Sequence, residues 1–120
     1  MRAIRVAIAI VLAFAPSLAR AHAELVRSTP ARRAVLVRAP DRVQLWFNER
    51  LEPAFSRLSV WDASGAQVDL ADAQVGTDDP KRLAVGLRPL GPGTYRVRFR
   101  VLSVDGHVVE SEFLFMLKAP

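Results

Sequence analysis

The chain has 120 residues, no cysteine and a formal net charge of +5. The absence of cysteine excludes disulfides, iron–sulfur clusters, blue-copper sites and cysteine nucleophiles. Three of the 17 basic residues precede Glu24, the first acidic residue, so the rest of the chain holds 14 basic and 12 acidic residues and a net charge of only +2. This near-neutral balance argues against nucleic acid as a partner.

The N-terminal segment has the layout of a secretory signal peptide. Arg2 and Arg5 give a positive start, Val6–Ala15 is an apolar run of ten residues, and Ala19-Arg20-Ala21 is a small-x-small cleavage pattern. A membrane anchor needs about 20 apolar residues, so the short run predicts export rather than a membrane span. We expect residues 1–21 to be removed and the product to be periplasmic.

Cleavage after Ala21 leaves residues 22–120, a length that suits one domain, and makes His22 the first residue of the mature chain. Cleavage after Ala23 is the alternative, because Ala21-His22-Ala23 is also a small-x-small pattern. That alternative would remove His22.

Short stretches of two-residue alternation, separated by turn formers, follow from Leu25 onward. In Thr94–Val101 one face is apolar and the other carries three arginines, which predicts a strand with one buried face. In Val109–Leu117, Leu114 and Met116 flank Phe115, so this strand's end is predicted to be buried on both faces. The other predicted strands are Leu25–Ser28, Ala34–Val37, Arg42–Phe47, Arg57–Trp61, Gln67–Leu70 and Leu83–Leu87.

Seven or eight such strands predict an all-β fold, an antiparallel two-sheet sandwich of immunoglobulin-like size. A closed barrel needs similar strands and remains an alternative. The segment Asn48–Ser56 breaks the alternation and contains Pro53, which is unfavourable in a central strand. We expect this segment to cross between the sheets.

The mature chain has two histidines, and both are placed where they could bind a metal ion. His22 would offer its imidazole and, after cleavage, the free α-amine of the chain. Asp105 and His107 flank Gly106 in a predicted tight turn between the last two strands. Their i, i+2 spacing puts both side chains on one face of an extended chain. Each residue alone also has an ordinary interpretation, since Asp-Gly commonly builds hairpins.

If the N-terminal segment pairs near this turn, His22, Asp105 and His107 together supply three nitrogens and one oxygen. A donor set without sulfur suits a tetragonal Cu(II) ion, with Ni(II) next and Zn(II) less well matched. The only methionine after residue 21, Met116, is predicted to pack in the core, so no thioether site for Cu(I) is expected. Protons compete for the nitrogens, so acid should weaken binding.

Three groups of residues resemble the CopC family of exported bacterial copper-resistance proteins. They are His22-Ala23-Glu24-Leu25 with Ser28-Thr29-Pro30, Gln44 to Glu49 with Glu52 to Ser56, and Tyr95-Arg96-Val97 with Val101 to His107. Each group is weakly specific alone, but the order and spacing of the three together are specific. Together they span nearly all of residues 22–120.

The resemblance implies a Greek-key β-sandwich and one Cu(II) ion bound by His22, Asp105 and His107. It also implies a non-enzymatic role as a copper carrier or buffer in copper homeostasis and resistance, and a CopD-type inner-membrane transporter as partner. The methionine-rich Cu(I) loop of some members is absent, which favours a Cu(II)-only protein.

Two other functions fit the residues. An N-terminal histidine with a second imidazole resembles the copper brace of oxidative polysaccharide-cleaving enzymes, although Asp105 would occupy the coordination position that such enzymes leave open. The domain could also be an immunoglobulin-like interaction module without a metal, because fold does not fix function.

Overall fold

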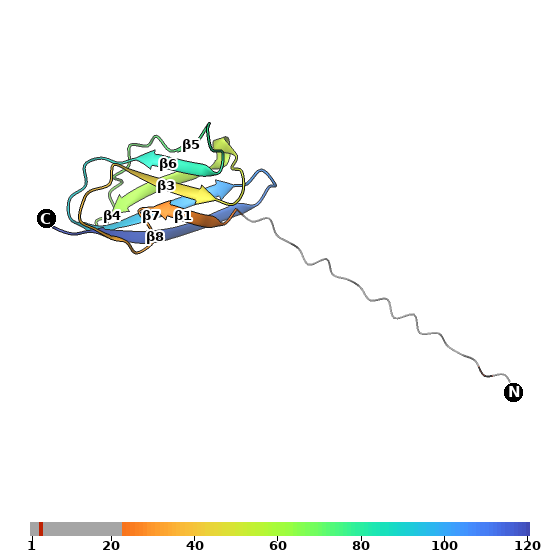
Figure 1. Cartoon of the computed structure of the whole chain (residues 1–120), viewed down its shortest axis with the longest axis horizontal. Helices are drawn as coiled ribbons and strands as arrows, with labels where there is room; N and C mark the ends of the chain where they lie inside the picture. The colour runs from red at the N-terminus through yellow and green to blue at the C-terminus, as the bar shows by residue number, and fades with distance from the viewer. Residues whose placement is uncertain (1–2, 4–22) are drawn as a thin grey trace.

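The computed structural model describes Ala3 and residues 23–120, and the described domain is a sandwich of two four-stranded sheets (Figure 1). One sheet has the strand order β1-β3-β6-β5 and the other β2-β8-β7-β4. The strands are β1 (Leu25–Thr29), β2 (Val35–Leu36), β3 (Arg42–Phe47), β4 (Arg57–Asp62), β5 (Gln74–Val75), β6 (Arg82–Gly86), β7 (Gly93–Leu102) and β8 (Val108–Leu117).

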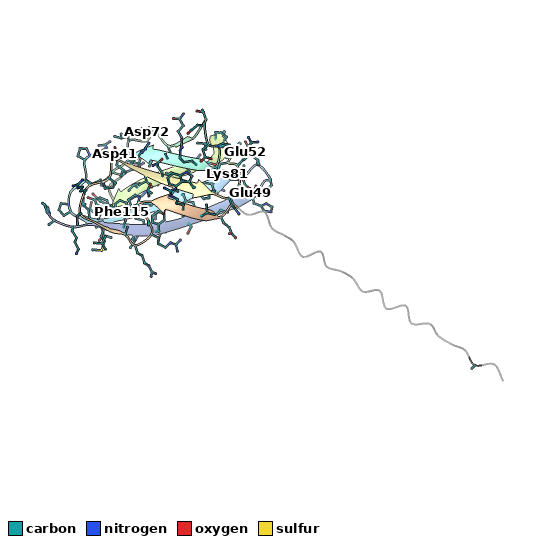
Figure 2. All side chains as sticks on the ribbon, in the orientation of Figure 1. Asp41, Glu49, Glu52, Asp72, Lys81 and Phe115 are labelled. Atoms are coloured by element: carbon teal, nitrogen blue, oxygen red, sulfur yellow. The ribbon has the colours of Figure 1, made fainter. Side chains whose placement is uncertain are left out.

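The core lies between the two sheets and is built by alternation along the longer strands. In β7, Tyr95, Val97, Phe99 and Val101 are buried, whereas the three arginines between them are exposed. Phe115 of β8 is completely buried and lies inside the sandwich (Figure 2). The all-β sandwich predicted from the sequence is therefore confirmed.

Two strand pairings frame the end of the sandwich that carries the turn between β7 and β8. β7 and β8, ten residues each, form an antiparallel hairpin whose pairs run from Gly93↔Leu117 to Leu102↔Val108. β1 pairs antiparallel with β3, and its register shifts between Leu25 and Arg27. One pair departs from the predicted antiparallel arrangement, since the short β2 lies parallel to β8. The chain reaches β2 by crossing from the other sheet, so it is not bound to antiparallel hairpin geometry there.

The segment between β3 and β4 crosses from one sheet to the other, as predicted. It contains a short 3₁₀ helix, Pro53–Phe55, which accommodates the proline outside any strand. Figure 2 shows Glu49 and Glu52 at one end of the sandwich and Asp41 towards the other.

The prediction of a strand at Gln67–Leu70 is wrong, because the strand in this region is β5, Gln74–Val75. The earlier segment makes only isolated bridges, Trp61↔Gln67 and Asp69↔Leu87. Asp69 turns inward as a buried acceptor for backbone N–H groups, and Ala71 has a φ of 56°. Both features interrupt an extended chain.

The prediction that the end of β8 is buried on both faces is also wrong. Leu114 and Met116 are 42% and 47% exposed, while Phe113, Phe115 and Leu117 are buried. Leu114 lies opposite Arg96 on the outer face of the sheet, which faces solvent. Met116 is therefore a surface residue and not part of the core.

Candidate metal centre

The turn between β7 and β8 carries two of the three predicted metal ligands. It is closed by Ser103 N–H donating to the His107 carbonyl at 3.0 Å and by Gly106 N–H donating to the Ser103 carbonyl at 2.9 Å. Gly106 has a φ of 92°, which disfavours any residue with a Cβ. The predicted Asp-Gly turn is therefore present.

The turn brings Asp105 and His107 together. His107 Nδ1 lies 3.1 Å from Asp105 Oδ1, and both side chains remain accessible, with exposed fractions of 47% and 29%. Two donor atoms bound at right angles to one ion, each about 2.0 Å from it, lie about 2.8 Å apart. The observed separation is thus close to that of neighbouring ligands on a small divalent cation.

The carboxylate of Asp105 is held as an anion by its neighbours. The Ser103 hydroxyl donates to Oδ1, and the backbone N–H of His107 lies 3.3 Å from the same oxygen. The hydrogen bond from Ser103, with smaller contributions from His107, lowers the pKa of Asp105 below its usual value, and partial desolvation opposes this shift. An ionised carboxylate is the form that binds a metal ion.

The first described residues of the domain lie at this same end of the sandwich. The Glu24 N–H donates to Asn48 Oδ1 at 2.7 Å, and the Asn48 N–H donates back to the Glu24 carbonyl at 3.1 Å. Ala23, one residue earlier, is completely buried. The chain is therefore fixed directly after the position of His22.

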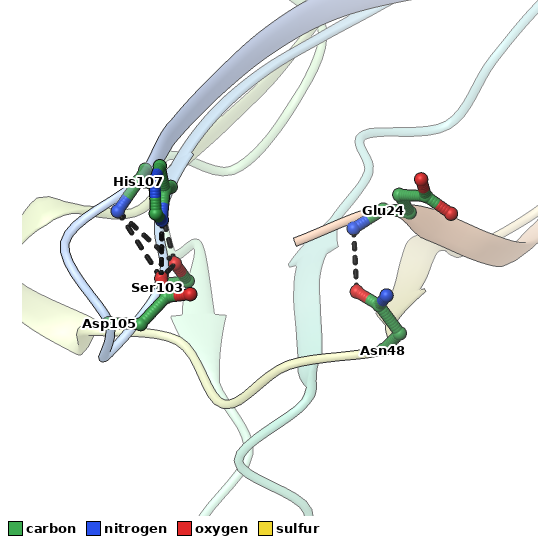
Figure 3. A network of polar contacts seen from close by, with 5 residues as sticks. All are labelled: Glu24, Asn48, Ser103, Asp105 and His107. Atoms are coloured by element: carbon green, nitrogen blue, oxygen red, sulfur yellow. Dashed lines mark hydrogen bonds and ion pairs between the residues drawn. The ribbon is translucent and has the colours of Figure 1, made fainter. Parts of the chain in front are cut away.

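The segment following Asn48 connects this anchor to the turn. Val104 N–H donates to the Arg50 carbonyl at 3.0 Å, and Leu51 forms a bridge with Ser103. Figure 3 shows the Glu24–Asn48 pair and the Ser103–His107 turn in one view. His22 itself lies outside the described residues, so its position relative to Asp105 and His107 stays a prediction.

Within residues 23–120, no group of three or more His, Asp and Glu side chains is arranged to hold a metal ion. In the same part of the chain, no helix is both long and apolar enough to cross a bilayer.

The sequence did not single out Ser103 or Asn48 as partners of the site. Ser103 stands two residues before Asp105, the spacing at which a hydroxyl and a carboxylate commonly meet in a turn. That spacing is the signal that could have identified it. Asn48 lies 24 positions from its partner Glu24, and no local pattern connects the two.

Comparison with known proteins decides the family. A sequence model of the CopC domain matches residues 25–118. The chain belongs to the CopC family. The family's copper resistance protein C from Pseudomonas syringae pv. tomato is 34% identical over 108 residues, which cover 85% of this chain and 85% of that protein. Protein YobA of Escherichia coli (strain K12) is 35% identical over 99 residues, covering 82% of this chain and 80% of YobA.

A third relative is much longer than this CopC-family chain. Copper transport protein CutJ of Bacillus subtilis (strain 168) is 32% identical over 107 residues, which cover 88% of this chain. The match spans only 20% of the length of CutJ.

Solved structures of the family have the same sandwich. CopC from Methylosinus trichosporium OB3b matches with a TM-score of 0.76 and 36% identity, covering 82% of this chain and 95% of that one. PcoC, described as a methionine rich copper resistance protein from Escherichia coli, matches with a TM-score of 0.71 and 34% identity, covering 82% of this chain and all of that one.

Proposed function

We propose that this CopC-family protein binds one Cu(II) ion outside the cytoplasm and acts as a copper carrier or buffer in copper resistance. The observation that carries the proposal is the pair formed by Asp105 and His107, 3.1 Å apart, at the end of the sandwich where residues 23 and 24 are anchored. The names of the relatives, copper resistance protein C and copper transport protein CutJ, support copper as the cargo.

The proposed ligands are the α-amine and imidazole of His22, a carboxylate oxygen of Asp105 and an imidazole nitrogen of His107. Three nitrogens and one oxygen favour Cu(II), which also has the highest affinity of the divalent first-row ions for such donors. Four protein donors leave little open equatorial coordination, so the arrangement favours holding the ion over activating a substrate at it. We therefore propose a binding protein and not an enzyme.

The absence of a sulfur-rich site separates this protein from the methionine rich PcoC. The chain has two methionines, Met1 and Met116, and Met1 lies in the predicted signal peptide. The exposed thioether of Met116 stands on β8, where its partners on the two neighbouring strands are Val35 and Thr94. Cu(I) sites generally need several thioether or thiolate ligands, so the proposed cargo is Cu(II) alone.

The proposed partner is a CopD-type inner-membrane transporter that receives the copper or supplies it. The match to CutJ supports this assignment, because a protein named for copper transport contains a region similar to this domain. That region makes up 20% of the length of CutJ. Export through a signal peptide of residues 1–21 would place the binding domain on the periplasmic side of that membrane.

The proposal is tested on protein that is expressed from the full chain, exported and purified, with its N-terminus checked by intact mass. Titration with Cu(II) should saturate at one ion per chain, and the EPR spectrum should show coupling to three nitrogens. A chain with one extra residue before His22 should bind more weakly and lose the amine coupling, because its α-amine is displaced. His22→Ala should lose the imidazole coupling instead. Equal affinity and equal spectra for all three proteins would rule out an N-terminal site.

A further inference from the structure

Ser103 is a fully buried polar residue at the base of the metal-binding turn. It directly follows β7, forms a bridge with Leu51 and has no exposed surface. A buried hydroxyl is costly unless its hydrogen-bonding capacity is used. Among the described residues, the hydrogen bonds of this hydroxyl lie within the turn itself, to Asp105 and to the backbone of His107.

The Ser103 hydroxyl has one proton and two acceptors within reach. It donates to Asp105 Oδ1, and the His107 carbonyl lies farther away, at 3.3 Å from Oγ. A charged acceptor forms the stronger hydrogen bond, so the carboxylate takes the proton. The lone pairs of Oγ then face the His107 N–H, also at 3.3 Å. One side chain thus connects Asp105 to the backbone of His107.

These bonds are all made to one of the two carboxylate oxygens. Among the described residues, the contacts of Asp105 with Ser103 Oγ, His107 N and His107 Nδ1 all involve Oδ1. The rotation of the carboxylate is therefore fixed through Oδ1, and no other described residue forms a hydrogen bond or ion pair with Oδ2.

We infer that Ser103 is a positioning residue for copper, which holds the Asp105 carboxylate in place so that this carboxylate and the His107 imidazole meet the same cation. The inference rests on the proposed function and adds a residue that does not touch the ion. Groups that fix metal ligands in this way typically change metal affinity by 10–100-fold when they are removed.

The chain offers a matched control in Ser56, a second buried serine at this end of the sandwich. Its exposed fraction is 9%, its hydroxyl donates to the Glu52 carbonyl at 2.9 Å, and it accepts from Leu102 N–H at 3.4 Å. Ser56→Ala therefore removes a buried hydroxyl near the site without touching Asp105 or His107.

The experiment compares Ser103→Ala, Ser103→Thr and Ser56→Ala with the wild-type protein, each processed to begin with His22. Competition titration gives the Cu(II) affinity, and EPR reports the ligand field. We expect Ser103→Ala to bind Cu(II) 10–100-fold more weakly and to have an altered EPR spectrum. Ser103→Thr, which keeps the hydroxyl, should restore both, and Ser56→Ala should change neither. In an Asp105→Asn background, Ser103→Ala should have no further effect on affinity.

Circular dichroism of the metal-free variants shows first whether each is folded. If alanine prevents folding, Ser103→Gly, which lacks both the hydroxyl and the Cβ, takes its place. A folded variant without the hydroxyl that keeps the wild-type affinity and spectrum would overturn the role of Ser103. Wild-type protein that binds no Cu(II) would instead overturn the proposed function, so the two failures are distinguishable.

Discussion

The Asp105 side chain makes contacts that an asparagine would preserve, which allows its charge to be tested separately from its structure. Both Ser103 Oγ and His107 N donate to Oδ1, and the side-chain amide of an Asp105→Asn variant would still present an acceptor oxygen there. We expect Asp105→Asn to lower the free energy of unfolding of the metal-free protein by no more than about 1 kcal/mol, because the turn keeps its hydrogen bonds and loses only their charge assistance.

The same substitution should weaken Cu(II) binding at least tenfold, since a neutral amide replaces an anionic ligand. Competition titration measures the affinity, and the EPR coupling to three nitrogens should persist. Asp41→Asn is the matched control, because it makes the same charge change on an exposed residue. Asp41 directly precedes β3, at the end of that strand away from Asn48. A large fall in the melting temperature of metal-free Asp105→Asn would show instead that Asp105 is mainly structural.

Asn48 is the residue that anchors the start of β1 to the end of β3. Asn48→Ala removes the acceptor for Glu24 N–H and should lower the free energy of unfolding by about 0.5–1.5 kcal/mol. Binding of the metal must then order the released residues before β1 again. A cost of about 1 kcal/mol for this ordering corresponds to about fivefold weaker Cu(II) binding.

Asn48→Asp provides the control for this anchor, because it keeps an acceptor oxygen at the same position. Its melting temperature and its Cu(II) affinity should stay near the wild-type values. If alanine and aspartate lower the affinity equally, the anchor does not act through the Glu24 backbone.

At the scale of the elements, Asp69 stabilises the crossover that follows β4. It is 3% exposed, and it accepts from Val60 N and Ala71 N, both at 2.8 Å. Asp69→Ala leaves both donors without this acceptor, at a cost of about 1–3 kcal/mol for each buried group. We expect a loss of about 2–4 kcal/mol in chemical denaturation. Asp41→Ala, on an exposed carboxylate, should change stability by less than about 0.5 kcal/mol.

The elements show which parts of this structure can be predicted from the sequence and which cannot. Arg42–Phe47 coincides with β3, and β7 follows the predicted alternation, because both strands have one buried and one solvated face. Gln67–Leu70 has the same local pattern, but its polar member Asp69 is buried as an acceptor for a distant backbone N–H. Alternation therefore identifies a strand only when the inward residues are apolar.

The candidate site also has residues that the sequence predicts and contacts that it does not. Asp105 and His107 are predicted by local turn chemistry, because both belong to one tight turn that needs no knowledge of the rest of the fold. The anchoring of Glu24 by Asn48 depends on the pairing of β1 with β3, and sequence alternation does not specify strand partners. The burial of Ser103 likewise depends on the packing of the segment between β3 and β4 against the turn.

At the scale of the whole molecule, the proposed copper ion would join the first residue of the mature chain to the last hairpin. These ligands come together only in the folded protein, so Cu(II) should stabilise the native state by mass action. Free Cu(II) at 100 times the dissociation constant contributes about 2.7 kcal/mol. For a domain of this size, that corresponds to a rise of about 10–20 °C in melting temperature.

Thermal unfolding of the processed protein with and without Cu(II) measures this gain. Because protons compete with the ion for the amine and imidazole nitrogens, the gain should shrink as the pH is lowered, while metal-free protein serves as the reference at each pH. A chain with one extra residue before His22 should show a smaller gain at the same Cu(II) concentration, since it lacks the N-terminal amine as a ligand. An equal gain in the extended chain would mean that copper stabilises the fold from a site elsewhere.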